Sequence, residues 1–136
     1  MNPTTVLAAT LAAVFVAFGT AKLLAVASMQ TRAAHVGFSV GAFRRIGALE
    51  VAGAVGLLAG AYVPLLRAVA AIGLLLLLTG AVITHLRNGD GIKAAAPALF
   101  LAILLSILVV IEIRVWDDVV SGFLQDRLLT WAAPDC

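Results

Sequence analysis

Four long apolar segments, separated by charged residues, dominate the hydrophobic pattern of the chain. They cover about residues 4–29, 43–64, 67–86 and 94–113. In lipid the backbone must satisfy its own hydrogen bonds, so an apolar run of about 20 residues, enough to cross a hydrocarbon core of about 30 Å, is expected to be helical. Barrel strands would alternate apolar and polar residues, and these segments do not. The pattern predicts an all-α fold, a bundle of four transmembrane helices.

The connections between the four segments differ in kind. Pro64 interrupts one long apolar run, and proline removes a backbone donor and restricts the residue before it. We therefore expect a tight antiparallel hairpin between the second and third helices. The Asn-Gly and Asp-Gly steps at residues 88–91 predict a short polar turn before the fourth helix. We interpret residues 30–43 as a plain loop, with a re-entrant or interfacial segment as the alternative.

After Arg114 the chain changes character. Apolar residues then recur at i, i+3, i+4 and i+7, namely Trp116, Val119, Val120 and Phe123. This spacing predicts an amphipathic helix at the membrane interface, anchored by its tryptophans. We accordingly divide the chain into a transmembrane domain, residues 1–114, and an interfacial helix and tail, residues 115–136. The alternative is that the fourth helix frays into a polar tail.

The composition narrows the class of protein. Hydrophobic residues make up 63% of the chain and charged residues 12%, about half the share of roughly 25% that soluble domains carry. Such a chain is not intrinsically disordered, and with Cys136 as its only cysteine it is not a disulfide-stapled domain. We assign the net charge of +2 to loops at the membrane surface, so we expect the lipid bilayer and no nucleic acid as partner.

The basic residues predict the orientation of the bundle, because cytoplasmic loops carry an excess of Lys and Arg. Six of the nine fall on the side of the first and third loops, namely Lys22, Arg32, Arg44, Arg45, Arg87 and Lys93. The other three, Arg67, Arg114 and Arg127, fall on the side of the two termini. We therefore expect cytoplasmic loops and both termini outside.

Three ionisable residues lie inside the predicted spans on one side of the bundle: Lys22, Glu50 and His85. An unpaired charge in the hydrocarbon costs about 2.5–3.5 kcal/mol on insertion scales, so we expect Lys22 and Glu50 to pair, with His85, Thr84 and Arg87 in the same polar cluster and Asp90 as the alternative to Arg87. Such a cluster can bind a small polar head, such as a quinone carbonyl or a lipid hydroxyl. Alternatively it is an ion pair that pins the helices and binds nothing, or Lys22 extends its stem to the headgroups.

Other features are assigned to packing and boundaries. Gly53, Gly56 and Gly60 form a small-residue surface for close helix contact, within the chain or with another protomer. Gly73 and Gly80 can do the same on the third helix. We interpret Glu112 and Arg114 as residues at the membrane boundary.

Several chemistries have no basis in the sequence. Two histidines, His35 and His85, are too few for a metal site built by the protein alone. The chain has no paired cysteines and no nucleotide-binding glycine motif between a strand and a helix. We therefore assign no catalytic residue, no metal and no intrinsic cofactor.

Three segments together resemble the DoxX-like family of small four-helix bacterial membrane proteins. They are residues 18–23 with G-x-x-K-L, residues 47–60 with G-x-x-E-x-x-G-x-x-G-L-L, and residues 81–90 with Thr-His and a basic Gly-Asp loop. The resemblance marks Lys22, Glu50 and His85 as the polar positions of the family and implies a multi-pass protein of the bacterial plasma membrane.

The resemblance implies less about function. The DoxX name comes from a subunit of a thiosulfate:quinone oxidoreductase, which implies an accessory or structural subunit of a membrane complex, linked to redox chemistry through quinone and not an enzyme on its own. Other membrane protein subunits or further copies of the chain would be its partners. The alternative is a small protein that itself binds a quinone or lipid and has enzyme activity of its own.

Overall fold

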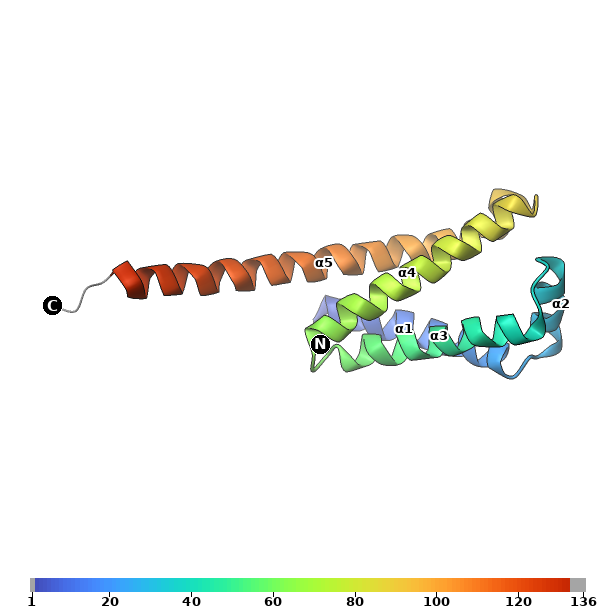
Figure 1. The fold of residues 1–136 in the computed structure, drawn as a ribbon, viewed down its shortest axis with the longest axis horizontal. Coiled ribbons are helices and arrows are strands. Elements are labelled where there is room, and N and C mark those ends of the chain that lie inside the picture. The colour runs from blue at the N-terminus through green and yellow to red at the C-terminus, as the bar shows by residue number, and fades with distance from the viewer. Residues whose placement is uncertain (1, 133–136) are drawn as a thin grey trace.

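The computed structural model describes residues 2–132, which form five α-helices and no strand (Figure 1). The helices are α1 (Pro3–Leu23), α2 (Ala27–His35), α3 (Val40–Ala59), α4 (Pro64–Arg87) and α5 (Gly91–Ala132). The all-α prediction is confirmed. The tight connection between α3 and α4 lies where Pro64 predicts it, with proline in the first turn of α4.

Local signals in the sequence account for the helix starts. Asn2 precedes α1, and its side-chain oxygen accepts a hydrogen bond from the Thr5 backbone N–H at 2.8 Å. Ser39 caps α3 in the same way, accepting from Ala42 N–H at 3.1 Å. Both caps satisfy a backbone donor that the first turn of a helix leaves without a partner.

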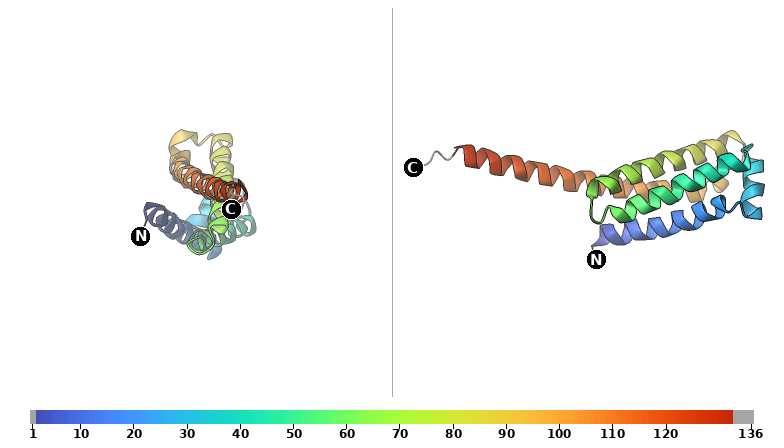
Figure 2. Two further views of the ribbon diagram at one scale, coloured as in Figure 1. Left: turned by 90° about the vertical axis from the view of Figure 1, so that its left-hand side faces the viewer. Right: turned by 60° about the horizontal axis from the view of Figure 1, so that its bottom comes forward.

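The long helices pack as two pairs, α1 with α3 and α4 with α5, and the pairs meet where α3 contacts α4 (Figures 1 and 2). All four helices contribute to one apolar core. Its largest fully buried side chains are Phe15, Leu11, Leu57, Leu74, Leu105 and Leu108. Apolar side chains elsewhere on these helices are largely exposed in the isolated chain, as expected of helices that face lipid.

The small-residue surface of α3 faces α4 of the same chain. A Cβ at Gly60 would lie 2.8 Å from Arg67 Cα, and one at Gly56 would lie 2.7 Å from Ala70 Cβ. A Cβ at Gly53 would meet the end of the Leu74 side chain at 2.6 Å. The close approach of α3 and α4 therefore depends on these glycines.

Two further glycines bring α1 and α3 together, whereas two others do not pack. A Cβ at Gly19 would lie 2.8 Å from the carbonyl oxygen of Gly47, and the reverse contact is equally tight. By contrast, beyond the adjoining backbone of α4 itself, nothing in the described residues lies within 4 Å of a Cβ built at Gly73 or Gly80. The contact that we expected at Gly73 and Gly80 is therefore not made within this chain.

Three helices are long and apolar enough to cross a membrane: α1, α4 and α5. Helix α3 is not among them, because its 20 residues include Arg44, Arg45 and Glu50. The prediction of four spans is therefore not confirmed.

The segment after α1 differs from the prediction. Helix α1 ends at Leu23 rather than near residue 29, and Ala25 takes a left-handed conformation with φ 48°. The chain then forms α2, so the plain loop that we predicted is wrong for this stretch. Met29 and Ala33 are four residues apart and both buried, which places them on one face of a helix and explains why α2 folds against its neighbours.

The break that we predicted near Arg114 does not occur in the described residues, because α5 runs on as one helix of 42 residues. Between Arg114 and Ala132 the sequence holds no proline and one glycine, Gly122, so nothing interrupts the hydrogen bonds of the helix. Residues 113–132, here called the α5 extension, are all exposed and project beyond the bundle (Figures 1 and 2). Residues 133–136 of the predicted tail lie outside the described residues.

Candidate functional site

Lys22 and Glu50 form the first ion pair of the bundle. Lys22 lies in the last turn of α1, and its Nζ donates to Glu50 Oε1 on α3 at 2.5 Å. The close contact between Gly19 and Gly47 lets the two helix backbones approach near this pair. Side-chain exposure is 15% for the lysine and 8% for the glutamate. The lysine also lies 5.3 Å from the centre of the Phe43 ring, a distance at which a cation and a ring attract each other.

The surroundings of this pair leave one acceptor open. Among the described residues Glu50 Oε2 is buried without a hydrogen-bond partner. A shallow hollow beside Lys22 is lined among others by Met29 and Phe43, and it has no room for a water-sized group. Pockets for small molecules usually measure about 300–1,000 Å³, so this hollow is too small to be such a pocket.

Arg67 and Glu112 form a second ion pair, which the sequence analysis missed. Arg67 Nη1 on α4 donates to Glu112 Oε1 on α5 at 3.0 Å, and the two side chains are 9% and 5% exposed. Our interpretation of Glu112 as a boundary residue is wrong, because the side chain is buried, whereas Arg114 is exposed. One signal could have found the pair: opposite charges lie at the same predicted end of the third and fourth spans.

The geometry around Arg67 is tight. Gly60 of α3 lies directly against the backbone of Arg67, which lets α4 cross α3 at this point. Arg67 Nε is buried and has no hydrogen-bond partner among the described residues. Most of the guanidinium charge is therefore balanced by one residue, Glu112.

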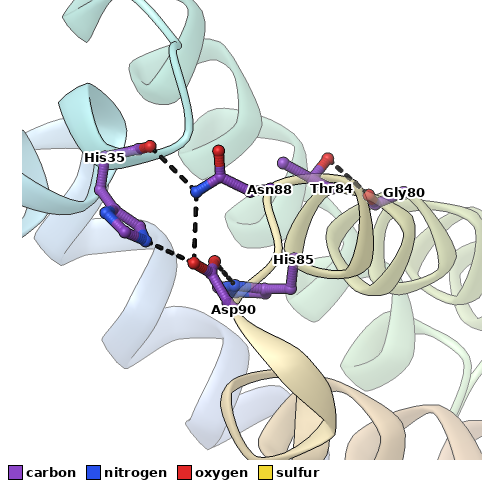
Figure 3. A network of polar contacts seen from close by, with 6 residues as sticks. All are labelled: His35, Gly80, Thr84, His85, Asn88 and Asp90. Carbon is purple, nitrogen blue, oxygen red and sulfur yellow. Dashed lines mark hydrogen bonds and ion pairs between the residues drawn. The ribbon is translucent and has the colours of Figure 1, made fainter.

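A third polar group lies around Asp90, just beyond the end of α4 that is opposite to Arg67 (Figure 3). The Asp90 carboxylate accepts hydrogen bonds from His35 Nε2 at 2.6 Å and from His85 Nδ1 at 2.9 Å. Asn88 Nδ2 donates to the His35 carbonyl oxygen at 3.1 Å and to Asp90 Oδ1 at 3.2 Å. These contacts tie the end of α2 to the turn between α4 and α5.

The single cluster that we predicted is therefore divided. Lys22 and Glu50 pair as expected, but His85 bonds to Asp90 instead of joining them. Thr84 donates to the Gly80 carbonyl of its own helix at 2.8 Å, and Arg87 is exposed. Gly89 and Gly91, with φ of 76° and 75°, fold the turn so that Asp90 returns to His85. The sequence did not show the role of His35, because α2 is what brings it here.

The profile of the DoxX-like family matches residues 6–107. The chain belongs to the DoxX-like family. No curated protein and no solved structure matches it.

The family match and the apolar helices together indicate that this DoxX-like protein is a membrane protein. The matched residues include Lys22, Glu50, Arg67 and His85, and they end before Glu112. The α5 extension lies beyond the matched region, so membership of the family implies no role for it.

The electrostatics around Asp90 follow from its two imidazole neighbours. Hydrogen bonds from His85 and then His35 hold the pKa of Asp90 below its usual value of 3.8, against a smaller opposing effect of burial. The carboxylate therefore stays ionised at neutral pH. Both of its oxygens are engaged by the histidines, and the described residues hold no group of three or more His, Cys, Asp or Glu arranged to bind a metal ion. This group acts as a polar tie between α2 and the turn.

Proposed function

We propose that this DoxX-like protein is an accessory, structural subunit of a membrane complex and not an enzyme on its own. One observation carries the proposal. Four charged side chains of the long helices, Lys22, Glu50, Arg67 and Glu112, are buried or nearly buried between these helices and are joined in two ion pairs. Charges that neutralise each other within one chain hold helices together and leave no buried ion free for a substrate.

The placement of the pairs supports a scaffolding role. One pair joins α1 to α3 and the other joins α4 to α5, and these are the two most extensively packed helix pairs. Breaking a buried pair by removing one partner leaves an uncompensated charge and costs about 3–5 kcal/mol. Each pair therefore fixes the register of its two helices, as expected of a rigid subunit on which others assemble.

A second candidate function rests on Glu50 Oε2. This buried acceptor has no hydrogen-bond partner among the described residues. The hydroxyl of a lipid or of a hydroquinone could donate a hydrogen bond to such an oxygen. A bound hydroquinone would also link the protein to redox chemistry. In this alternative the chain itself binds a quinone or lipid, and Glu50 holds the ligand head.

Purification from native membranes in a mild detergent separates the two candidates. Mass spectrometry would identify co-purifying membrane proteins and extracted quinones or lipids for the wild type, for Glu50→Gln and for the control Asp118→Asn, which makes the same change on the exposed extension. We expect a membrane protein in fixed stoichiometry with all three chains and no stoichiometric quinone. A solitary chain carrying a stoichiometric quinone that only Glu50→Gln loses would overturn the proposal in favour of the second candidate.

We also infer that the protein lies in a bacterial plasma membrane with both termini outside. The support is the excess of basic residues on the side of the first and third loops. Single cysteines at two exposed serines, Ser121 and Ser28, in a Cys136→Ser background would test the orientation. We expect an impermeant maleimide to label Ser121→Cys in intact cells and Ser28→Cys only after lysis. The reverse result would refute the orientation.

A further inference from the structure

The α5 extension is too long to belong to the membrane-crossing part of α5. At 1.5 Å per residue a helix of 42 residues is about 63 Å long, twice a hydrocarbon core of about 30 Å. Helices α1 and α4 have 21 and 24 residues. Residues 113–132 therefore continue past the end of the bundle, where no other described helix packs on them.

The extension carries an apolar stripe that no other helix covers in the described part of the chain. Ile113, Trp116, Val120 and Phe123 are spaced by three, four and three residues, which are the a and d positions of a coiled-coil heptad. The side chains on the opposite face, at b and f positions, are mostly polar, namely Arg114, Asp118, Ser121 and Gln125. In proteins most of the stability of a helix comes from packing of its apolar face rather than from helix propensity.

We propose that a second copy of this chain covers the stripe, so that two α5 extensions form a parallel two-helix coiled coil. Copies inserted with the same topology are related by a two-fold axis along the membrane normal. Their extensions therefore leave the bilayer on the same side, run parallel and present identical faces, which is the requirement for a two-fold interface. A stripe that begins where the bundle ends suits this arrangement.

The charges on the extension complement each other in such a pair. Arg127 continues the stripe at an a position, where two arginines would repel each other. Asp126 occupies the adjoining g position, so in a parallel pair each Asp126 carboxylate can approach the Arg127 guanidinium of the other copy. Within one chain the guanidinium lies 5.5 Å from the centre of the Phe123 ring, so the arginine stem already lies along the stripe.

A lipid surface fits the same stripe less well. Helices that lie on a membrane carry Lys and Arg on the polar face, whereas the extension has three acidic and two basic residues, Asp117, Asp118, Asp126, Arg114 and Arg127. Lying flat would also require a bend at the start of the extension, where α5 is continuous.

Cysteine cross-linking of the full-length protein in nanodiscs tests the contact directly. In a Cys136→Ser background, Val120→Cys places the thiol at an a position and Ser121→Cys places it on the outer face as a matched control. We expect oxidation to give a disulfide-linked dimer with Val120→Cys and little or none with Ser121→Cys. Equal cross-linking of both variants, or none in either, would overturn the proposal.

A charge exchange supplies a second test that does not depend on cysteine. We expect Asp126→Arg to raise the dissociation constant of the dimer by more than about tenfold, measured by native mass spectrometry in detergent, and the combined variant Asp126→Arg/Arg127→Asp to restore it. A monomeric Trp131→Phe variant whose remaining tryptophan, Trp116, shifts its fluorescence to the blue on adding vesicles would show that lipid covers the stripe and would refute the dimer. Neither result bears on co-purifying subunits, so the proposed accessory function is tested separately.

Discussion

The two ion pairs of the bundle each join a basic side chain to a glutamate. They differ in how easily the basic side chain can move its charge out of the bundle. Lys22 is near the end of α1, is 15% exposed and borders a small hollow, so its flexible stem can carry the ammonium outward if its partner is lost. Arg67 is 9% exposed, with Nε buried and Gly60 against its backbone. Burial of the cation, rather than the presence of a pair, therefore determines how much each pair contributes to stability.

The largest expected effect is the loss of the anion from the more buried pair. We expect Glu112→Gln to lower the free energy of unfolding by about 3–5 kcal/mol, because Arg67 is left buried and charged. Unfolding in mixed micelles with increasing sodium dodecyl sulfate would measure this. The double variant Arg67→Met/Glu112→Gln removes the stranded charge and should recover much of the loss. If the double variant is no more stable than Glu112→Gln, the stranded charge is not the cause.

The helix crossing beneath Arg67 should be the next most sensitive feature. A Cβ at residue 60 would lie 2.9 Å from the Arg67 backbone nitrogen, so Gly60→Ala should force α3 and α4 apart and cost about 1–3 kcal/mol. Gly73→Ala is the matched control, because nothing described lies within 4 Å of its Cβ, and it should leave stability unchanged or slightly raised. The same titration measures both variants. Equal losses would mean that the close crossing has no special role.

Removing the anion of the other pair should have a smaller effect. We expect Glu50→Gln to cost about 1–2 kcal/mol, the order of a lost buried hydrogen bond, because Lys22 can move its charge toward the headgroups. Lys22→Met should cost more than Glu50→Gln, since the glutamate is short and would remain charged in the core. The reverse order, measured in the same titration, would show that Lys22 has no such escape.

The smallest expected effect concerns pH at the polar tie around Asp90. Because the pKa of Asp90 is lowered in the folded protein, its contribution to stability is complete above its unfolded pKa of about 4 and is lost as pH falls through the lowered pKa. We expect the melting temperature of the wild type to fall below pH 4 more steeply than that of Asp90→Asn. Melting curves from pH 6 to pH 2.5 would measure this, and parallel curves would contradict it.

Much of the fold could be predicted from where the charges lie, because a charge in lipid demands a partner. Lys22 and Glu50 stood at similar depths in neighbouring spans, and that was sufficient to predict the pair. The Arg67–Glu112 pair follows from the same logic, but both residues lie near span ends, where charges usually mark a boundary. Span counting alone could not distinguish a boundary charge from a buried one.

The remaining differences between prediction and structure arise where the local structure depends on packing or on helix continuity rather than on local composition. We expected a loop from residue 30 onward because that stretch is polar, whereas residues 30–35 belong to α2, in which Met29 and Ala33 are buried against neighbouring helices. His35 reaches Asp90 only as a result of that helix. We expected the chain to leave the fourth helix near Arg114 because its composition changes there, whereas α5 is continuous because no helix-breaking residue follows.

Double-mutant cycles on both ion pairs test most directly the central claim that these charges are unequal structural pins. The cycles use Arg67→Met with Glu112→Gln and Lys22→Met with Glu50→Gln, and each yields a coupling free energy of unfolding. We expect coupling in both, larger for Arg67–Glu112 by about 1 kcal/mol or more, toward the upper part of the range for contacting residues. Negligible coupling in either pair, or a larger coupling for Lys22–Glu50, would contradict this claim.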